Sequence, residues 1–270
     1  MDYRRIIPCL DTKNGRLVKG INFVDLKELG DPAEAAAAYS EAGADELVFL
    51  DITATLEGRQ TFLETVQRTV AEISIPLTVG GGIGSLDDIR KLFHLGVARV
   101  SLSSAPVREP ELIDRATKEF GSERIVIAID TRSNPALPSG FEVVVRGGTK
   151  PTGLDAVKWA KEVTDRGAGT LLPTSMDADG TQAGYDIPMT RAIADAAGIP
   201  VIASGGAGTL EHLYDAIAKG HADAVLVASI AHYGTFTIRQ IKEYLQNRGV
   251  PVKLGDREKT KLTSKIKEDL

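Results

Sequence analysis

The 270-residue chain carries 32 Lys and Arg residues against 37 Asp and Glu residues, a formal net charge of −5, and 43% of it is hydrophobic. This composition is typical of a globular protein with a sizeable core, and the negative charge argues against a nucleic-acid-binding surface. The single cysteine, Cys9, allows no internal disulfide, and no apolar run approaches the ~18 residues that cross a membrane. We therefore expect a cytoplasmic protein without a nucleic-acid or membrane partner.

Short apolar runs alternate with amphipathic stretches along the chain, the pattern of buried strands between helices. Asp31 before Pro32 predicts a helix start, and Gly43, Gly96, Gly167 and Gly220 stand where helices are expected to end. Strands are expected at 5–10, 46–50, 75–79, 99–102, 124–129, 170–173, 199–203 and 224–228, and helices at 31–43, 85–96 and 153–167, among others.

The second half of the chain repeats the first. IPLTVGGGIGSLDDIRKLFHLG (75–96) aligns with IPVIASGGAGTLEHLYDAIAKG (199–220), and RIIPCLDTK (5–13) aligns with RIVIAIDTR (124–132). Two copies of about 120 residues, each with four strand–helix units, predict an α/β fold: a closed eightfold βα barrel, or TIM barrel, built from two half-barrels. An open doubly wound sheet is the alternative, and it explains the repeat less well.

We expect one barrel over residues 1–254, with half-barrels at about 1–120 and 121–254. The last stretch, residues 255–270, has five basic and four acidic residues and no aromatic residue. Such a segment buries little apolar surface, so we expect a disordered tail or a weak terminal helix.

Each RII–DT and RIV–DT strand ends in an aspartate, Asp11 in the first strand and Asp130 in the fifth. In an eightfold barrel these strands are opposite each other, and functional groups lie at the carboxyl ends of strands. An aspartate in this position can simply cap the next turn. Two aspartates at symmetric positions favour a pair of carboxylates that face each other across one mouth and act as general acid and base.

Two glycine-rich loops, VGGGIGSLDD and ASGGAGTLEH, each leave a strand and open a helix. Backbone N–H groups at a helix N-terminus bind anions without a lysine, and glycine lets the anion approach closely. The strand ends that follow, SLSSA (101–105) and LVASI (226–230), add small and hydroxyl side chains. One such loop is weak evidence, because glycine can serve only the turn. Two loops on opposite sides of the mouth predict a ligand with a phosphate at each end.

The polar loop MDADGTQAGYD (176–186) follows the predicted sixth strand and can lie close to the second phosphate loop. DADG is similar to part of a calcium loop, but the closing glutamate and the flanking helices of that motif are missing. The four histidines are scattered, and His94 and His212 fall on predicted helices. We therefore expect neither a metal nor a cofactor, and no serine-type triad.

Residues 3–254 resemble the cyclase subunit of imidazole glycerol phosphate synthase, through RIIPCLDTKNGRLVKGINF, PLTVGGGI, SMDADGTQAGYD and IPVIASGGAG. The resemblance implies an ammonia-dependent lyase of histidine biosynthesis. Such an enzyme converts a bisphosphorylated phosphoribulosyl-formimino aminoimidazole carboxamide ribonucleotide into imidazole glycerol phosphate and aminoimidazole carboxamide ribonucleotide.

The resemblance also implies roles for single residues. Asp11 becomes the principal general base and Asp130 a general acid, and Lys19 corresponds to a lysine of a mobile loop over the mouth. Asp51 and Thr174 would line the floor of the site. The residues implied for the first phosphate are Gly82, Ser103 and Ser104, and those for the second are Asp179, Gly180, Gly206, Ala207, Ala228 and Ser229.

In this family a glutaminase subunit docks on the N-terminal face of the barrel and supplies ammonia along its axis, past a ring of charged residues. Here the ring positions hold Arg5, Glu46, Arg99 and Thr170, where the family has an arginine, a glutamate, a lysine and a second glutamate. Other departures are Ala98 for an interface aspartate, Ser103 for an asparagine and Ala231 for a phenylalanine. They bear on the coupling to a glutaminase more than on the chemistry.

Three other functions stay open at this level. The sister ribonucleotide isomerase of the same pathway shares the fold and both phosphate loops. The segments GINF (20–23) and DGTQAGYD (179–186) are more similar to the cyclase. A paralogue of the cyclase with an altered substrate or partner is another alternative. A non-catalytic phosphate-binding scaffold is the last, but a scaffold has no evident need for Asp11 and Asp130.

Overall fold

The computed structural model describes residues 3–13, 15–21, 24–51, 63–232 and 234–254. Eight parallel strands follow one another along the chain, each in an apolar run that predicted it. Every run is rich in Val, Ile and Leu, as strands covered on both faces are. These strands are β1 (Arg5–Lys13), β4 (Leu47–Asp51), β5 (Leu77–Gly80), β6 (Arg99–Leu102), β7 (Ile125–Ser133), β10 (Thr170–Ser175), β11 (Ile202–Ala203) and β12 (Ala224–Val227).

The parallel pairings form a ring. β1 pairs with β4, β4 with β5, β5 with β6, β6 with β7 and β7 with β10. Two parallel bridges, Leu171 to Val201 and Thr174 to Ser204, join β10 to the segment of β11, and β12 pairs with both β11 and β1. Three strands separate β1 from β7 in either direction, so the two halves of the repeat place these strands opposite each other.

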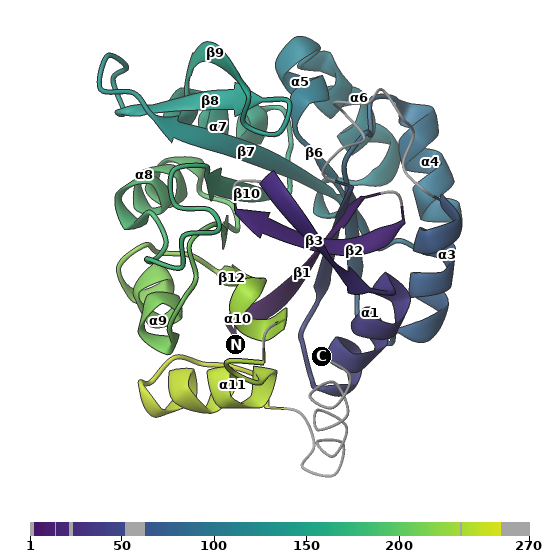
Figure 1. The fold of residues 1–270 in the computed structure, drawn as a ribbon. Coiled ribbons are helices and arrows are strands. Elements are labelled where there is room, and N and C mark those ends of the chain that lie inside the picture. The colour runs from purple at the N-terminus through teal and green to yellow at the C-terminus, as the bar shows by residue number, and fades with distance from the viewer. Residues whose placement is uncertain (1–2, 14, 22–23, 52–62, 233, 255–270) are drawn as a thin grey trace.

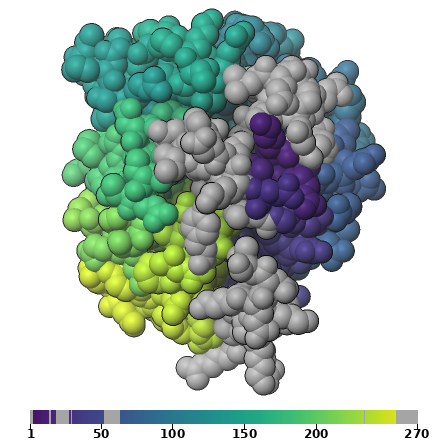
Figure 2. Space-filling model, viewed as in Figure 1, coloured from purple at the N-terminus to yellow at the C-terminus, as the bar shows by residue number. Residues whose placement is uncertain are grey.

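Helices cover the outside of the strands, and the colours of Figure 2 follow one another around the molecule from blue through teal and green to yellow. Successive strand–helix units therefore lie side by side, as in an eightfold barrel. The helices are α1 (Pro32–Glu41), α3 (Leu63–Glu72), α4 (Leu86–His94), α5 (Ser104–Arg108), α6 (Glu111–Phe120), α7 (Ala156–Asp165), α8 (Ile187–Ala197), α9 (Leu210–Ala218), α10 (Ser229–His232) and α11 (Ile238–Asn247), with a short 3₁₀ turn η1 (Ser122–Arg124).

The repeat extends to the ends of the helices. Asp31 caps α1 and Asp155 caps α7, each by accepting two backbone N–H groups, and these residues are 124 positions apart. Ser85 and Thr209 cap α4 and α9 at the same spacing. Gly43, Gly96 and Gly167 have positive φ after their helices, as expected, whereas after α9 the positive φ falls on His221 and not on Gly220.

Two antiparallel hairpins extend the barrel beyond the predicted elements. β2 (Arg16–Ile21) and β3 (Val24–Gly30) continue from β1, and β8 (Phe141–Val145) and β9 (Lys150–Asp155) continue from β7. In Figure 1 the first hairpin lies across the centre of the view. Two expectations were therefore wrong. β1 and β7 do not end at their aspartates but run two and three residues further, and residues 153–155 belong to β9 and not to the following helix.

Alternate residues of the strands point into the barrel. Ile7, Cys9, Val126 and Leu172 belong to one buried cluster with residues of β4, β11 and β12, whereas their neighbour Ile6 packs in a separate outer cluster. Because side chains alternate along a strand, Asp11 shares the inner face of Ile7 and Cys9. Asp130 shares the inner face of Val126 in the same way. The fold thus directs both carboxylates to the mouth of the barrel.

Candidate active site

Asp11 and Asp130 occupy equivalent places on opposite strands. Asp11 is paired with Leu50 of β4, and Asp130 is paired with Thr174 of β10. Thr174 follows Leu50 by 124 residues, so the two partners are also equivalent in the repeat. Both lie near the carboxyl ends of their strands, above the apolar cluster that fills the barrel interior. Asp11 is 5% exposed, and the thiol of Cys9 donates a hydrogen bond of 3.4 Å to its Oδ1.

The threonine after each aspartate explains why the chain contains Asp-Thr twice. Thr12 Oγ1 donates to the carbonyl of Leu50 at 3.1 Å, and Thr131 Oγ1 donates to the carbonyl of Thr174 at 3.2 Å. In both halves the hydroxyl therefore ties the strand to its neighbour directly beside the carboxylate. Such supports restrict the position of the preceding aspartate.

The two carboxylates differ in their surroundings. Burial raises the pKa of Asp130 to about 7, and the negative charge of Asp179 adds to the increase. A hydrogen bond with Ser103 opposes it, because it stabilises the ionised form. A carboxyl group with this pKa is partly protonated at neutral pH and can act as a general acid.

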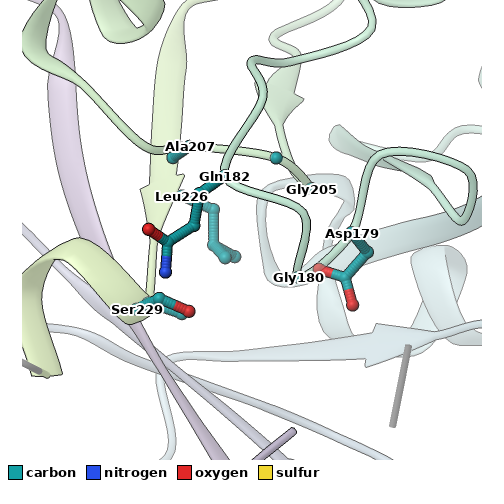
Figure 3. Close-up of a pocket in the computed structure, with 9 residues that line it drawn as sticks. Asp179, Gly180, Gln182, Gly205, Ala207, Leu226 and Ser229 are labelled. Carbon is teal, nitrogen blue, oxygen red and sulfur yellow. The ribbon is translucent and has the colours of Figure 1, made fainter. Parts of the chain in front are cut away.

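The second glycine loop opens into a pocket at the mouth (Figure 3). Loop 176–186 contributes Asp179, Gly180 and Gln182, and the figure shows Gln182 and Ser229 on one side and Asp179 on the other. The structure thus brings together all six residues predicted for the second phosphate, and it adds three that were not predicted for this site, Gln182, Gly205 and Leu226. The complete lining is Asp179, Gly180, Gln182, Gly205, Gly206, Ala207, Leu226, Ala228 and Ser229.

Two backbone donors in this pocket have no acceptor within the described part of the chain. Gly206 is buried, and among the hydrogen bonds of the described residues none uses the N–H groups of Gly206 and Ala207. Buried N–H groups are rarely left without an acceptor, so the N–H of Gly206, beside that of the partly exposed Ala207, is suited to an anion. Asp179 cannot play the same part, because an ionised carboxylate only accepts hydrogen bonds and repels a phosphate.

The glycines of these loops serve a close approach of backbones. A Cβ on Gly206 would lie 2.0 Å from the carbonyl oxygen of Gly184, and one on Gly81 would lie 2.2 Å from that of Asp51. Both glycines also have positive φ. Glycine is thus required for the packing of neighbouring loops, whether or not a phosphate binds, and this reason was not recognised from the sequence.

The residues predicted for the first phosphate lie on neighbouring segments. Gly82 follows β5, Ser103 follows β6, and Ser104 is the first residue of α5. Ser103 is hydrogen-bonded to Asp130, and Ser104 Oγ accepts a hydrogen bond of 3.1 Å from the N–H of Arg146, in the turn between β8 and β9. Ser104 therefore retains its own hydroxyl hydrogen for a ligand. The second hairpin, which sequence reasoning missed, reaches this site.

Three further residues were predicted at the mouth. Asp51 is the last residue of β4 and is 2% exposed. Thr174 lies in β10, next to β7, and is paired with Asp130. Lys19 lies in β2, paired with Lys27 of β3, but its side chain is outside the described part of the structure. Of the segment GINF, residues 22 and 23 are outside the described residues, as is the predicted tail, 255–270.

The residues predicted at the ammonia entrance lie at the amino ends of four strands: Arg5, Arg99 and Thr170 are the first residues of β1, β6 and β10, and Glu46 directly precedes β4. Arg5 and Arg99 both bind the buried Glu46, at 2.7 and 2.8 Å, so the two cations share one carboxylate. Thr170 stands 124 residues after Glu46 and is 7% exposed. Next to this cluster lies a cavity of about 600 Å³, whose lining includes Glu46, Arg99 and the half-exposed Tyr3.

Arg124 is the repeat counterpart of Arg5, and it has a different set of partners. It donates to the carbonyls of Val97 and Ala98 at 3.1 and 3.3 Å and lies 3.5 Å from the centre of the Phe93 ring. Thr170 offers no carboxylate where the first half has Glu46. The charged cluster is therefore confined to one half of the face.

Among the described residues, no three His, Cys, Asp or Glu side chains are grouped to hold a metal ion. No helix in the described part of the chain is long and apolar enough to cross a membrane.

Comparison with known proteins gives consistent results. A family model described as "Histidine biosynthesis protein" matches residues 5–237. The chain is 60% identical over 253 residues to the imidazole glycerol phosphate synthase subunit HisF of Nostoc sp., which covers 93% of this chain and 97% of that protein. It is 57% identical over 251 residues to the protein of the same name from Synechocystis sp., with coverages of 93% and 96%. Their names imply that these relatives form a complex with a partner subunit. The chain belongs to the family of imidazole glycerol phosphate synthase subunit HisF.

Proposed function

We propose that the chain catalyses the cyclase reaction of histidine biosynthesis. It uses ammonia to convert a bisphosphorylated phosphoribulosyl-formimino aminoimidazole carboxamide ribonucleotide into imidazole glycerol phosphate and aminoimidazole carboxamide ribonucleotide. The observation that carries the proposal is the pair of opposed aspartates, Asp11 and Asp130, beside a pocket whose Gly206 and Ala207 N–H groups have no acceptor among the described residues. The relatives named above support the same reaction.

The residues have distinct tasks in this proposal. Gly206, Ala207 and Ser229 bind one phosphate, and Gly82 and Ser104 bind the other, so the reacting centre lies between Asp11 and Asp130. Asp11 accepts a proton as general base. Asp130, with a pKa of about 7, donates a proton as the ring closes and the carboxamide ribonucleotide leaves. Holding both ends of the substrate fixes its centre against the carboxylates, which can supply much of the rate enhancement.

The opposite face is assigned to the ammonia supply. A glutaminase subunit docks on the N-terminal face, and ammonia enters past Arg5, Glu46 and Arg99. The supporting observation is the cavity of about 600 Å³ beside these residues, whose rim carries Tyr3 at 41% exposure and Leu254 at 40%. We further propose that residues 1–254 act as one barrel and that the protein is cytoplasmic.

The test is an assay of the purified chain with the bisphosphate substrate and ammonium salt, without a glutaminase. Formation of both products in equal amounts is expected, whereas the sister isomerase would form neither from this substrate. D11N and D130N should each lower turnover by ~10²-fold or more, because each removes one partner of the acid–base pair. D165N, at an exposed aspartate at the end of α7, is the control that keeps normal turnover. Near-normal turnover in both D11N and D130N contradicts the assignment.

A further inference from the structure

A partly buried histidine connects the strand of Asp11 with the short helix beside the second pocket. His232 is the last residue of α10, which begins with the pocket residue Ser229. Its Nε2 lies 2.8 Å from the carbonyl oxygen of Cys9 in β1, and its Nδ1 lies 2.7 Å from the hydroxyl of Tyr39 in α1. One imidazole thus links three segments of the chain: its own helix α10, the strand β1 at Cys9 and the helix α1 at Tyr39.

The partners determine the arrangement of protons on the ring. A carbonyl oxygen only accepts hydrogen bonds, so Nε2 carries the hydrogen. In the neutral ring Nδ1 is then the acceptor and the hydroxyl of Tyr39 is the donor. Burial raises the pKa of Tyr39, which keeps its hydroxyl protonated and able to donate. The Tyr39 and His232 rings lie 5.7 Å apart, and Tyr39 packs against both large hydrophobic clusters, so its position is well supported.

The contact with Cys9 lies just beyond the last paired residues of β1 and β12. The pairing of β1 with β12 ends at Pro8 and Val227, and Cys9 is the next residue of β1. The imidazole N–H therefore adds one more link between β1 and the segment after β12. Cys9 also donates through its thiol to Asp11 Oδ1, and the N–H of His232 donates to the carbonyl of the pocket residue Ala228 at 2.8 Å.

We propose that His232 is a positioning residue: it joins α10 to the strand of Asp11 and so sets the position of the second phosphate relative to the catalytic base. The inference rests on the proposed function, in which the substrate is anchored at the start of α10 and reacts at Asp11. A displacement of about 1 Å between anchor and base can lower the rate ~10²-fold. Of the groups proposed to bind this phosphate, Gly206 and Ala207 lie outside α10, so most of the phosphate binding should persist when the link through His232 is lost.

The experiment compares kcat and KM of His232 variants in the ammonium-driven assay. H232L removes both ring nitrogens and should lower kcat at least tenfold while KM stays within about threefold. H232Q can still donate through its amide to Cys9 and should recover most of kcat, whereas the shorter H232N should not. Y39F removes only the hydroxyl and should give a smaller loss than H232L, because the bond to Cys9 remains.

Matched controls lie outside the site. H221Q changes an exposed histidine that pairs with Asp195, and Y244F removes a hydroxyl that binds Glu211. Both should keep normal kcat and KM. Thermal unfolding identifies any variant that does not fold, and if H232L fails, the contrast between H232Q and H232N decides. Equal kcat in those two variants, or a loss expressed only in KM, overturns the proposal. An inactive wild-type chain would instead contradict the cyclase assignment itself.

Discussion

Asp11 and Asp130 are equivalent in the repeat, but their immediate neighbours make them chemically different. Asp130 lies near the carboxylate of Asp179, and together with burial this raises its pKa to about 7. Asp11 has the thiol of Cys9 as a donor. The acid–base roles that we propose therefore rest on the surroundings of Asp130, which the repeat does not duplicate at Asp11.

The first prediction concerns the pH dependence of turnover. If protonated Asp130 is the acid, kcat should fall as pH rises through about 7. D179N removes a negative charge, lowers the pKa of Asp130, and should move this decline to lower pH. D177N, at a neighbour that instead accepts from the N–H of Ser133, is the control and should leave the profile unchanged. A decline at the same pH in D179N and wild type would contradict the electrostatic assignment.

The second prediction concerns stability. The pKa of Asp130 is raised from 3.8 to about 7 on folding, so the unfolded chain releases this proton more readily. The free energy of unfolding should therefore decrease as pH rises from about 4 to 7, and this loss is complete above pH 7. D130N has no carboxyl group to ionise in the folded state, so its free energy of unfolding does not fall with pH in this way. It should be more stable than wild type at pH 8 by roughly 1–3 kcal/mol, with little difference near pH 4. Urea unfolding at both pH values measures it, and equal stabilities at pH 8 would refute the pKa assignment.

At the scale of elements, the glycine loops are where backbone packing and ligand binding meet. In VGGGIG, Gly81 has φ +95° and no room for a Cβ, whereas a Cβ on Gly84 would meet nothing within 4 Å. G81A should therefore destabilise the protein by ~2 kcal/mol or more and raise KM by moving Asp51, which the new Cβ would strike. G84A, in the same loop, should stay within ~0.5 kcal/mol of wild type. Denaturant unfolding and KM measurements distinguish the two, and similar effects of both substitutions would contradict the packing argument.

What the sequence could predict at this scale was local or repeated. All eight parallel strands and the Asp31–Pro32 helix start follow from apolar runs and cap residues, and the opposed aspartates follow from the repeat. The two hairpins were missed because a short apolar segment such as FEVVV (141–145) gives a weak signal beside longer apolar runs. The contact between His232 and Cys9 joins residues 223 positions apart. No periodicity records such a contact, since it depends on how α10 packs against β1.

At the scale of the whole molecule, the two halves share their architecture but not their charges. In the first half Arg5 binds Glu46, which also binds Arg99. In the second half Thr170 stands at the position equivalent to Glu46, and Arg124 donates hydrogen bonds to the carbonyls of Val97 and Ala98. Both halves thus carry an aspartate at the mouth, whereas at the opposite face their charged residues and contacts differ. That face is the one we propose for the glutaminase.

The last prediction concerns this face. Two cations share Glu46, and the partly exposed Ala98 offers no carboxylate to a docked subunit. A charge pair across an interface is worth up to a few kcal/mol, and each 1.4 kcal/mol changes affinity tenfold. We therefore expect good turnover with ammonium salt but weak glutamine-driven turnover with a glutaminase from another family member. The double variant A98D/T170E should lower the glutaminase concentration needed for half-maximal coupling about tenfold, because T170E supplies a second carboxylate near the entrance and A98D supplies one for the partner.

The uncharged pair A98N/T170Q is the matched control, since it changes shape and size in the same way without adding charge, and it should leave coupling at the wild-type level. The ammonium-driven rate should be the same in all three proteins, because both positions lie at the end of the barrel opposite Asp11 and Asp130. Titration of the glutaminase at saturating glutamine, beside the ammonium assay, measures both quantities. Tight coupling of the unmodified chain to a non-cognate glutaminase contradicts the prediction. So does a changed ammonium rate in A98D/T170E, which would place these residues in the chemistry and not in the supply of ammonia.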